Sequence, residues 1–195
     1  DGSEPMLTGL TERPARIDKN MRGQIADAHG IGRKYMNKIF HGHPGLAAAT
    51  INEFLMEESK PRLFRCLDDG EGQPVARAYL SDRYNRFDSI DLLKAIAPVI
   101  NGLPGIRWEA NYLDQAGFDI KLFWPGKQFD LGAGDIIEAG ARIRSNEVGT
   151  GAAYDILPAT KRLWCSNGCY HNEARFSRTH VSSTRSEEHT SELQS

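Results

Sequence analysis

The spacing of apolar and polar residues divides the chain into a helical first part and a second part made mainly of strands. Between residues 20 and 59, apolar positions recur every three or four residues, which predicts amphipathic helices separated by Gly30 and by a turn at residues 41–45. Pro61 ends this helical part. Residues 1–19 are polar and contain two prolines, so we expect them to form a loop or a poorly ordered end.

The second part alternates between apolar and polar positions in the manner of strands. One helix interrupts them, with Asp88 or Ser89 as its N-cap, and Pro98 is expected to kink or end it. Residues 125–135 are rich in glycine and predict a loop. The fold class that follows is α+β, with N-terminal helices followed by a mostly antiparallel sheet and one crossing helix. The predicted strands cover residues 63–67, 75–84, 106–112, 118–124, 138–144 and 152–164.

Both ends of the chain indicate a fragment. Residues 185–195 resemble the translated read of a common sequencing adapter, and the chain opens at Asp1 without an initiator Met. We therefore expect a polar N-terminal segment over residues 1–19 and a single α+β domain over residues 20–184, truncated at its C-terminal end. Residues 185–195 are interpreted as an artefact tail.

The charge balance gives no general attraction to nucleic acid. The chain has 24 Lys and Arg against 26 Asp and Glu; without the tail, which holds one Arg and three Glu, the counts are 23 and 23. No apolar run approaches the roughly 18 residues of a membrane span, so no membrane contact is expected. Three cysteines make no disulfide framework, which is typical of a reducing compartment such as a bacterial cytoplasm.

Three short polar motifs follow or end apolar runs. They are Ser81-Asp82-Arg83-Tyr84, Ser145-Asn146-Glu147-Val148-Gly149 and Cys165-Ser166-Asn167-Gly168. An arginine beside an acid can form an internal ion pair or bind a phosphate with its forked guanidinium group. Two interpretations stay open: the motifs fix the register of the sheet, or they form one shared site. The polar cluster of such a site would be Ser81, Asp82, Asn146, Glu147 and Asn167.

The segment from Gln24 to Ile39 has the spacing of a helix-turn-helix. Ala26 would pack where the helices cross, and Gly30 would make the turn. A plain structural corner between two helices needs the same small residues, so both interpretations remain. In a DNA-binding corner, the second helix would present Arg33, Lys34, Asn37 and Lys38 to a groove.

The sequence gives no reason to expect a metal or a cofactor. The pairs His41-x-His43 and Cys169-x-His171, with Cys165 nearby, have irregular spacing, whereas structural zinc sites usually show two clean ligand pairs. Gly132-Ala-Gly134 is an isolated GxG that a turn explains. No nucleotide-binding P-loop, serine-hydrolase or zinc-protease motif is present.

Most of residues 20–181 resembles a phage- and plasmid-borne family classed as domain of unknown function 932. The resemblance is carried by the segments IADAHGIGRKYMNKIF, ARAYLSDRYNRFDSIDLL, SNEVGTGA and LWCSNGC, and by FSRTH at residues 176–180, all in the order of that family. The family often has Asn-Ser where this chain has Ser145-Asn146. The resemblance implies a mobile-element protein in bacteria or phage and supplies no established activity.

The first hypothesis is an accessory protein of mobile-element DNA metabolism that binds single-stranded nucleic acid. It rests on analogy with phage single-strand annealing proteins, which use a curved antiparallel sheet with a crossing helix and tend to form rings. A homo-oligomer is therefore a further expectation. The expected binding residues are Arg77, Tyr79, Arg83, Arg142 and Arg144, with Tyr79 or Trp108 stacking on bases.

This hypothesis requires the binding side chains of each predicted strand to lie on the same face of that strand. Period two places Arg77, Tyr79 and Arg83 on one face of a predicted strand, and Arg142 with Arg144 on one face of another. Exposure of the arginines together would support a nucleic-acid groove. Their burial in ion pairs, for example with Asp82 and Glu147, would count against it.

Three other functions remain open, although the residues favour a binding protein over an enzyme. A metal-dependent nuclease or hydrolase would hold Mg²⁺ with Asp82, Asp88 and Glu147, assisted by His180 or Arg83. A transcriptional regulator would use the helix pair and would need residues 33–38 exposed with Tyr35 turned inward. In a purely structural or partner-binding protein the polar motifs would not converge.

Overall fold

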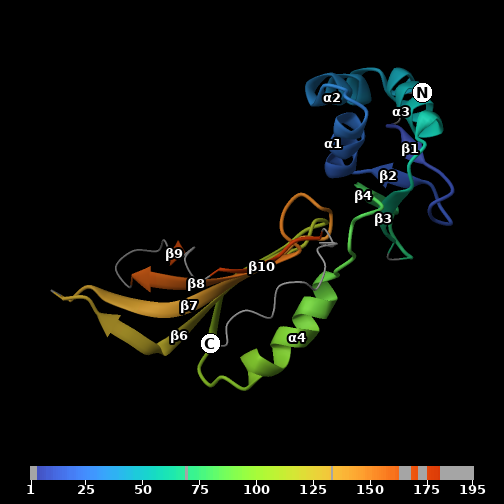
Figure 1. Ribbon diagram of the computed structural model, residues 1–195. Coiled ribbons are helices and arrows are strands. Elements are labelled where there is room, and N and C mark those ends of the chain that lie inside the picture. The colour runs from blue at the N-terminus through green and yellow to red at the C-terminus, as the bar shows by residue number, and fades with distance from the viewer. Residues whose placement is uncertain (1–3, 69, 133, 163–167, 171–174, 181–195) are drawn as a thin grey trace, which may run out of the picture.

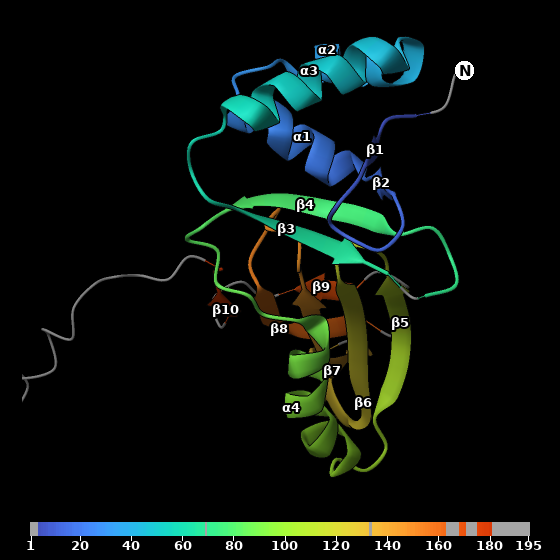
Figure 2. The same cartoon turned by 90° about the vertical axis from the view of Figure 1, so that its right-hand side faces the viewer.

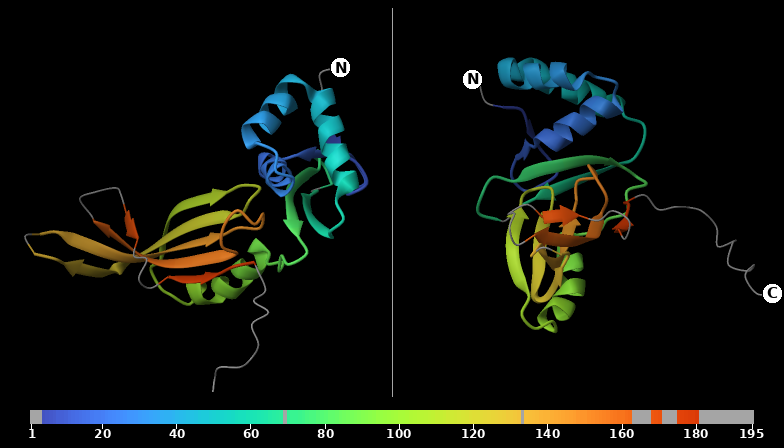
Figure 3. Two further views of the ribbon diagram at one scale, coloured as in Figure 1. Left: turned by 45° about the horizontal axis from the view of Figure 1, so that its top comes forward. Right: turned by 90° about the vertical axis from the view of Figure 1, so that its left-hand side faces the viewer.

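The predicted α+β class is confirmed by the computed structural model, which describes residues 4–68, 70–132, 134–162, 168–170 and 175–180. Within these ranges, four helices and ten strands form an α+β fold built on two sheets. Three helices lie on the first sheet, and the fourth lies along the second (Figures 1 and 2). The second sheet extends away from the helical end of the molecule (Figure 3).

The first sheet carries the three N-terminal helices on one face. Its strand order is β1-β2-β4-β3, with bounds Met6–Leu7, Ala15–Ile17, Val75–Ser81 and Arg62–Leu67. The helices are α1 (Lys19–Ala28), α2 (Arg33–Gly42) and α3 (Pro44–Glu57), as the periodicity predicts. Their apolar sides and the sheet enclose a core that includes Met21, Ile25, Met36, Phe40 and Ile51.

Strands β1 and β2 correct the expectation that residues 1–19 form only a loop. Ala15 and Ile17 are 0% and 2% exposed, and β2 runs parallel to β4 in the middle of the first sheet. A parallel partner lies far along the chain, so a three-residue strand of this kind leaves little local pattern. Part of the N-terminal segment therefore belongs to the domain.

The second sheet is antiparallel, and α4 (Ser89–Asn101) covers one of its faces. Its order is β10-β8-β7-β6-β5, and β9 pairs with β8. One local expectation is wrong, because β6 continues to Asp130 through part of the predicted loop. The helix α4 continues through Pro98 to Asn101, so of the two expected effects of Pro98 it does not end the helix. The bounds from β5 to β10 are Arg107–Leu113, Phe118–Asp130, Ile136–Ser145, Tyr154–Arg162, Gly168–Tyr170 and Phe176–Arg178.

A β-bulge in β4 changes where its side chains point. Cys66 of β3 is opposite Ala76, and Arg65 is opposite Ala78, so Arg77 is the extra residue between them. A bulge interrupts the alternation of faces and redirects side chains. The strand also ends at Ser81. The prediction that period two puts Arg77, Tyr79 and Arg83 on one face is therefore wrong.

Candidate functional site

The carboxylate of Glu147, in the loop after β7, accepts hydrogen bonds from two strands of the first sheet and from the start of α4. Arg77 Nη2 donates to Glu147 Oε2 at 2.8 Å, and Arg65 Nη2 donates to the same oxygen at 3.0 Å. The N–H of Ser89, at the start of α4, donates to Oε1 at 2.7 Å, where the positive end of the helix dipole favours a carboxylate. The bulge in β4 explains why Arg77 and Arg65 can point to the same group.

A second carboxylate completes this group, which we call the junction cluster: Arg65, Arg77, Asp88, Ser89 and Glu147. Asp88 accepts a hydrogen bond from Arg65 on one oxygen and from the exposed Arg86 on the other, at 2.8 Å. The side chains of Arg65 and Arg77 are each 9% exposed. Arg65 Nη1 and Arg77 Nε find no acceptor among the described residues.

Both carboxyl groups are held in the charged form. Burial raises the pKa of Glu147, but hydrogen bonds from Ser89 and Arg77 outweigh burial, so its pKa lies below the ordinary value. The pKa of Asp88 is lowered chiefly by the hydrogen bond from Arg86, against the effect of burial. The cluster is therefore a set of paired ions at neutral pH.

The motif at residues 145–149 folds into a tight loop that places Glu147. Asn146 Oδ1 accepts the N–H groups of Val148 and Thr150, each at 3.2 Å, which closes the loop. Gly149 has φ of 71°, and a Cβ there would lie 2.6 Å from a methyl carbon of Leu80. Val148 is fully buried against β4, so the loop after β7 packs directly on the first sheet.

The start of the first motif is exposed, and only its last residue, Tyr84, enters the junction. Tyr84 Oη donates to the carbonyl of Glu147 at 2.7 Å, and burial raises its pKa to about 12. Its ring stacks on His180 with centroids 4.2 Å apart. His180 is 5% exposed, and its ring nitrogens lie 3.0 and 2.5 Å from the carbonyl oxygens of Asn85 and Asn146. Two of the motifs therefore converge, together with the FSRTH segment.

Two further residues of the predicted polar cluster, Ser81 and Asp82, lie outside this junction. Ser81, Asp82 and Arg83 are exposed at the end of β4 and in the turn that follows it. Asn167, in the third motif, and the tail from residue 185 lie outside the described residues. The convergence of all three motifs therefore stays a prediction, because Asn167 of the third motif lies outside the described residues.

The structure does not gather the five predicted nucleic-acid-binding residues on one free surface. Arg77 is 7% exposed and bound to Glu147, the arrangement expected to count against a groove. Tyr79 is 3% exposed and packs in the helical core, so its ring has no free face for a base. Its hydroxyl instead donates to Glu58 at 3.2 Å, and burial raises its pKa to about 12.

The other two arginines share a face of β7, as period two predicts, and both are paired. Arg142 binds Asp119 through two nitrogens, with Nε at 2.9 Å from Oδ1. Arg144 Nη2 donates to Asp155 Oδ2 at 2.8 Å. This face of the second sheet is therefore lined with compensated charges.

The donors expected for Mg²⁺ are arranged for arginine instead. Asp88 and Glu147 are bridged by Arg65, and Asp82 is exposed in the turn after β4. No three His, Cys, Asp or Glu residues in the described ranges are grouped so that they could hold a metal ion. A cation at Glu147 would have to displace two guanidinium groups. The junction cluster is thus suited to joining the two sheets.

Arg65 is the residue of the cluster that the sequence reasoning missed. It lies in the middle of the apolar run Leu63-Phe64-Arg65-Cys66-Leu67. A charged residue inside a strand that is otherwise apolar needs a buried partner, because an unpaired ion is costly to bury. That requirement was the available signal, and Glu147 and Asp88 meet it.

The outward face of α2 is the second candidate site. Gly30, with φ of 67°, lies just beyond the end of α1, and the Ile31 N–H donates to the Ala26 carbonyl at 2.8 Å, which makes the tight turn before α2. Met36 and Ile39 are buried beneath α2. Its exposed side carries Arg33, Lys34, Tyr35, Asn37 and Lys38.

Two of these residues have partners. Arg33 donates to Asp27 through two nitrogens, with Nε at 2.8 Å. Asn37 Oδ1 accepts from Arg22 Nε at 2.9 Å. Tyr35 is 51% exposed, so the expected inward position of this ring is wrong. The helix pair otherwise has the arrangement that the spacing predicts.

No family model, curated protein sequence or solved structure matches this chain. The resemblance to domain of unknown function 932 therefore stays a prediction. Among the described residues, no helix combines the length and the apolar character needed to cross a membrane.

Proposed function

We propose that this chain is a nucleic-acid-binding protein that contacts duplex DNA through the outward face of α2. The observation that carries the proposal is the α1–turn–α2 arrangement, in which the apolar side of α2 is buried and Lys34, Asn37 and Lys38 face outward. A helix presented in this way fits the major groove, about 12 Å wide, with its first turns at the base edges.

The polar groups on this face suit both parts of DNA. Within the described part of the chain, no carboxylate pairs with Lys34 or Lys38, so both ammonium groups can bind phosphate. Arg33 is already held by Asp27, which leaves the lysines to supply the charge. Because the Asn37 oxygen is occupied by Arg22, its amide N–H groups remain to donate to base acceptors.

The geometry favours α2 over the sheet groove of the first hypothesis. Arg77 is buried, and Arg142 and Arg144 are paired with carboxylates, so these cations are not free for phosphate. The proposal keeps a nucleic-acid function and moves the contact to the helix pair. A role in phage or plasmid DNA metabolism in a bacterial cytoplasm rests on the family resemblance alone.

Fluorescence anisotropy of a labelled duplex, titrated with the protein at several salt concentrations, tests the proposal. Saturable binding that weakens with salt is expected. The double variant Lys34→Ala/Lys38→Ala should bind more weakly and reduce the salt slope by about 2, because each lost phosphate contact contributes about 0.9. Lys94→Ala, an exposed lysine on α4, is the matched control and should bind as the unchanged protein does. Equal binding by the double variant, or none by the unchanged protein at low salt, would overturn the proposal.

A further inference from the structure

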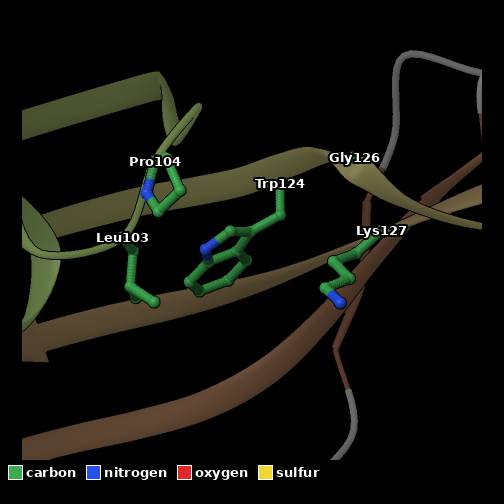
Figure 4. A pocket seen from close by; sticks show the side chains of 5 residues that line it. All are labelled: Leu103, Pro104, Trp124, Gly126 and Lys127. Atoms are coloured by element: carbon green, nitrogen blue, oxygen red, sulfur yellow. The ribbon is translucent and has the colours of Figure 1, made fainter.

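A pocket of about 330 Å³ lies between the C-terminal end of α4 and the projecting part of β6. Leu103 and Pro104, which follow α4, form one wall, and Trp124, Gly126 and Lys127 of β6 form the other (Figure 4). Its volume is at the lower end of the range of small-molecule sites, about 300–1,000 Å³. Its lining contains no residue of the junction cluster or of α2.

An irregularity in β6 creates this pocket. Phe123 is opposite Gly140 of β7, and Gln128 is opposite Glu138, so residues 124–127 face a single residue of the partner strand. The extra residues leave the regular ladder, and Pro125 has no N–H to contribute to it. The indole ring of Trp124 is thereby placed between Leu103 and the side chain of Lys127 (Figure 4).

The lining has two chemical parts. Trp124, Leu103 and Pro104 offer a flat aromatic face and an apolar wall, and most of the pocket surface is apolar. Lys127 is exposed at one end, and no carboxylate among the described residues pairs with it. A planar ring can stack on the indole while an attached anion reaches the ammonium group.

We infer that this pocket binds a nucleotide unit, with the base stacked on Trp124 and the phosphate on Lys127. In a duplex both faces of each base are already stacked, so the unit must come from an unpaired strand or from a free nucleotide. The ammonium group of Lys127 favours a ring that carries an attached anion over a neutral apolar side chain of a protein partner. This site is separate from α2 and does not depend on the proposed duplex contact.

Anisotropy of a labelled oligothymidine strand, with dTMP, unlabelled strand and duplex as competitors, tests the inference. Trp124→Leu and Lys127→Gln should each weaken binding of the strand about tenfold, which is the usual cost of losing one stacked base or one charged contact. Tyr112→Leu, which replaces an exposed aromatic residue on β5, is the control and should change binding less than twofold. Lys127→Gln changes an exposed side chain, so its effect is not confused with a failure to fold.

The outcomes separate the two proposals. Competition by the strand that far exceeds competition by dTMP identifies an unpaired strand as the source, whereas equal competition identifies a free nucleotide; both support the pocket. Binding by Trp124→Leu and Lys127→Gln that equals binding by the control overturns it, as does absence of any binding to strand or dTMP. If Lys34→Ala/Lys38→Ala loses duplex binding while the pocket variants keep strand binding, the α2 proposal stands and the pocket proposal fails. If the pocket variants lose strand binding while Lys34→Ala/Lys38→Ala keeps duplex binding, the pocket proposal stands and the α2 proposal fails.

Discussion

Arg77 lies in β4 of the first sheet and Glu147 in the loop that follows β7 of the second, yet Arg77 Nη2 lies 2.8 Å from Glu147 Oε2. The two residues are 70 positions apart in the chain, so the contact forms only when the sheets have come together. Arg65 reaches the same oxygen from the neighbouring strand. One carboxylate therefore pairs with two buried cations at the junction.

Replacing Glu147 with glutamine should destabilise the protein. The amide keeps the shape but removes the charge, so the buried guanidinium groups of Arg65 and Arg77 lose a partner. The expected loss is about 3 kcal/mol in the free energy of unfolding, the usual cost of breaking a buried ion pair on one side. Urea unfolding measures it, with the slope expected to stay unchanged.

Glu53→Gln is the control for that experiment, because Glu53 is an exposed carboxylate on α3. It should alter the free energy of unfolding by no more than about 0.5 kcal/mol. A Glu147→Gln protein as stable as this control would show that the junction cluster contributes little to assembly.

Acid should remove the stabilisation that the cluster provides. The pKa values of Glu147 and Asp88 are lowered in the folded protein, so the unfolded chain takes up protons first as the pH falls. The contribution is complete above the ordinary carboxyl value of about 4 and is lost as the pH falls through the lowered values. In urea unfolding at a series of pH values, the difference between the unchanged protein and Glu147→Gln should shrink below pH about 4. A constant difference down to acid pH would contradict this.

Adding a methyl group at Gly149 should be costly. Gly149 has a positive φ, and a Cβ would lie 2.6 Å from Leu80, so Gly149→Ala strains the backbone and collides with the core of the junction. We expect thermal unfolding to show a loss of about 2 kcal/mol. Gly45→Ala in α3, where a Cβ meets nothing within 4 Å, should instead stabilise by about 0.5 kcal/mol. Equal effects at the two positions would rule out this account.

Two tyrosines should resist ionisation. Burial raises the pKa of Tyr79 and of Tyr84 to about 12, against about 10 for an ordinary tyrosine. A spectrophotometric titration of the six tyrosines should show a late phase near pH 12 while the protein stays folded. Tyr84→Phe should reduce the amplitude of that phase. The stability linked to the neutral hydroxyl is complete below pH about 10 and is lost as the pH rises through the folded value.

Local patterns were enough to find the helices and most of the second sheet. The spacing around Ile25, Met36 and Ile51 identifies a buried side for each helix, because that spacing depends only on residues one turn apart. The short β2 was missed because its strand character comes from a parallel partner more than fifty positions away, at Val75 and Ala76. No local window contains that partner.

The candidate sites were predictable to different degrees. The corner at Gly30 follows from spacing alone, and its outward residues are those expected except for Tyr35. The junction cluster required knowledge of the bulge at Arg77, which depends on how β3 pairs with β4. The same holds for residues 124–127, whose displacement from the ladder is a property of two strands and is not encoded in either one by itself.

The contact between Gln24 and Val148 affects the order in which the parts of the chain can fold during synthesis. Gln24 Nε2 donates to the Val148 carbonyl at 2.6 Å, and its Oε1 accepts the N–H of Tyr79, so α1, β4 and the loop after β7 are joined by one side chain. A nascent chain that has emerged only as far as β4 holds the cations of Arg65 and Arg77 without their carboxylate. The N-terminal helices and their sheet therefore complete their folding only after residues 147 and 148 have been synthesised.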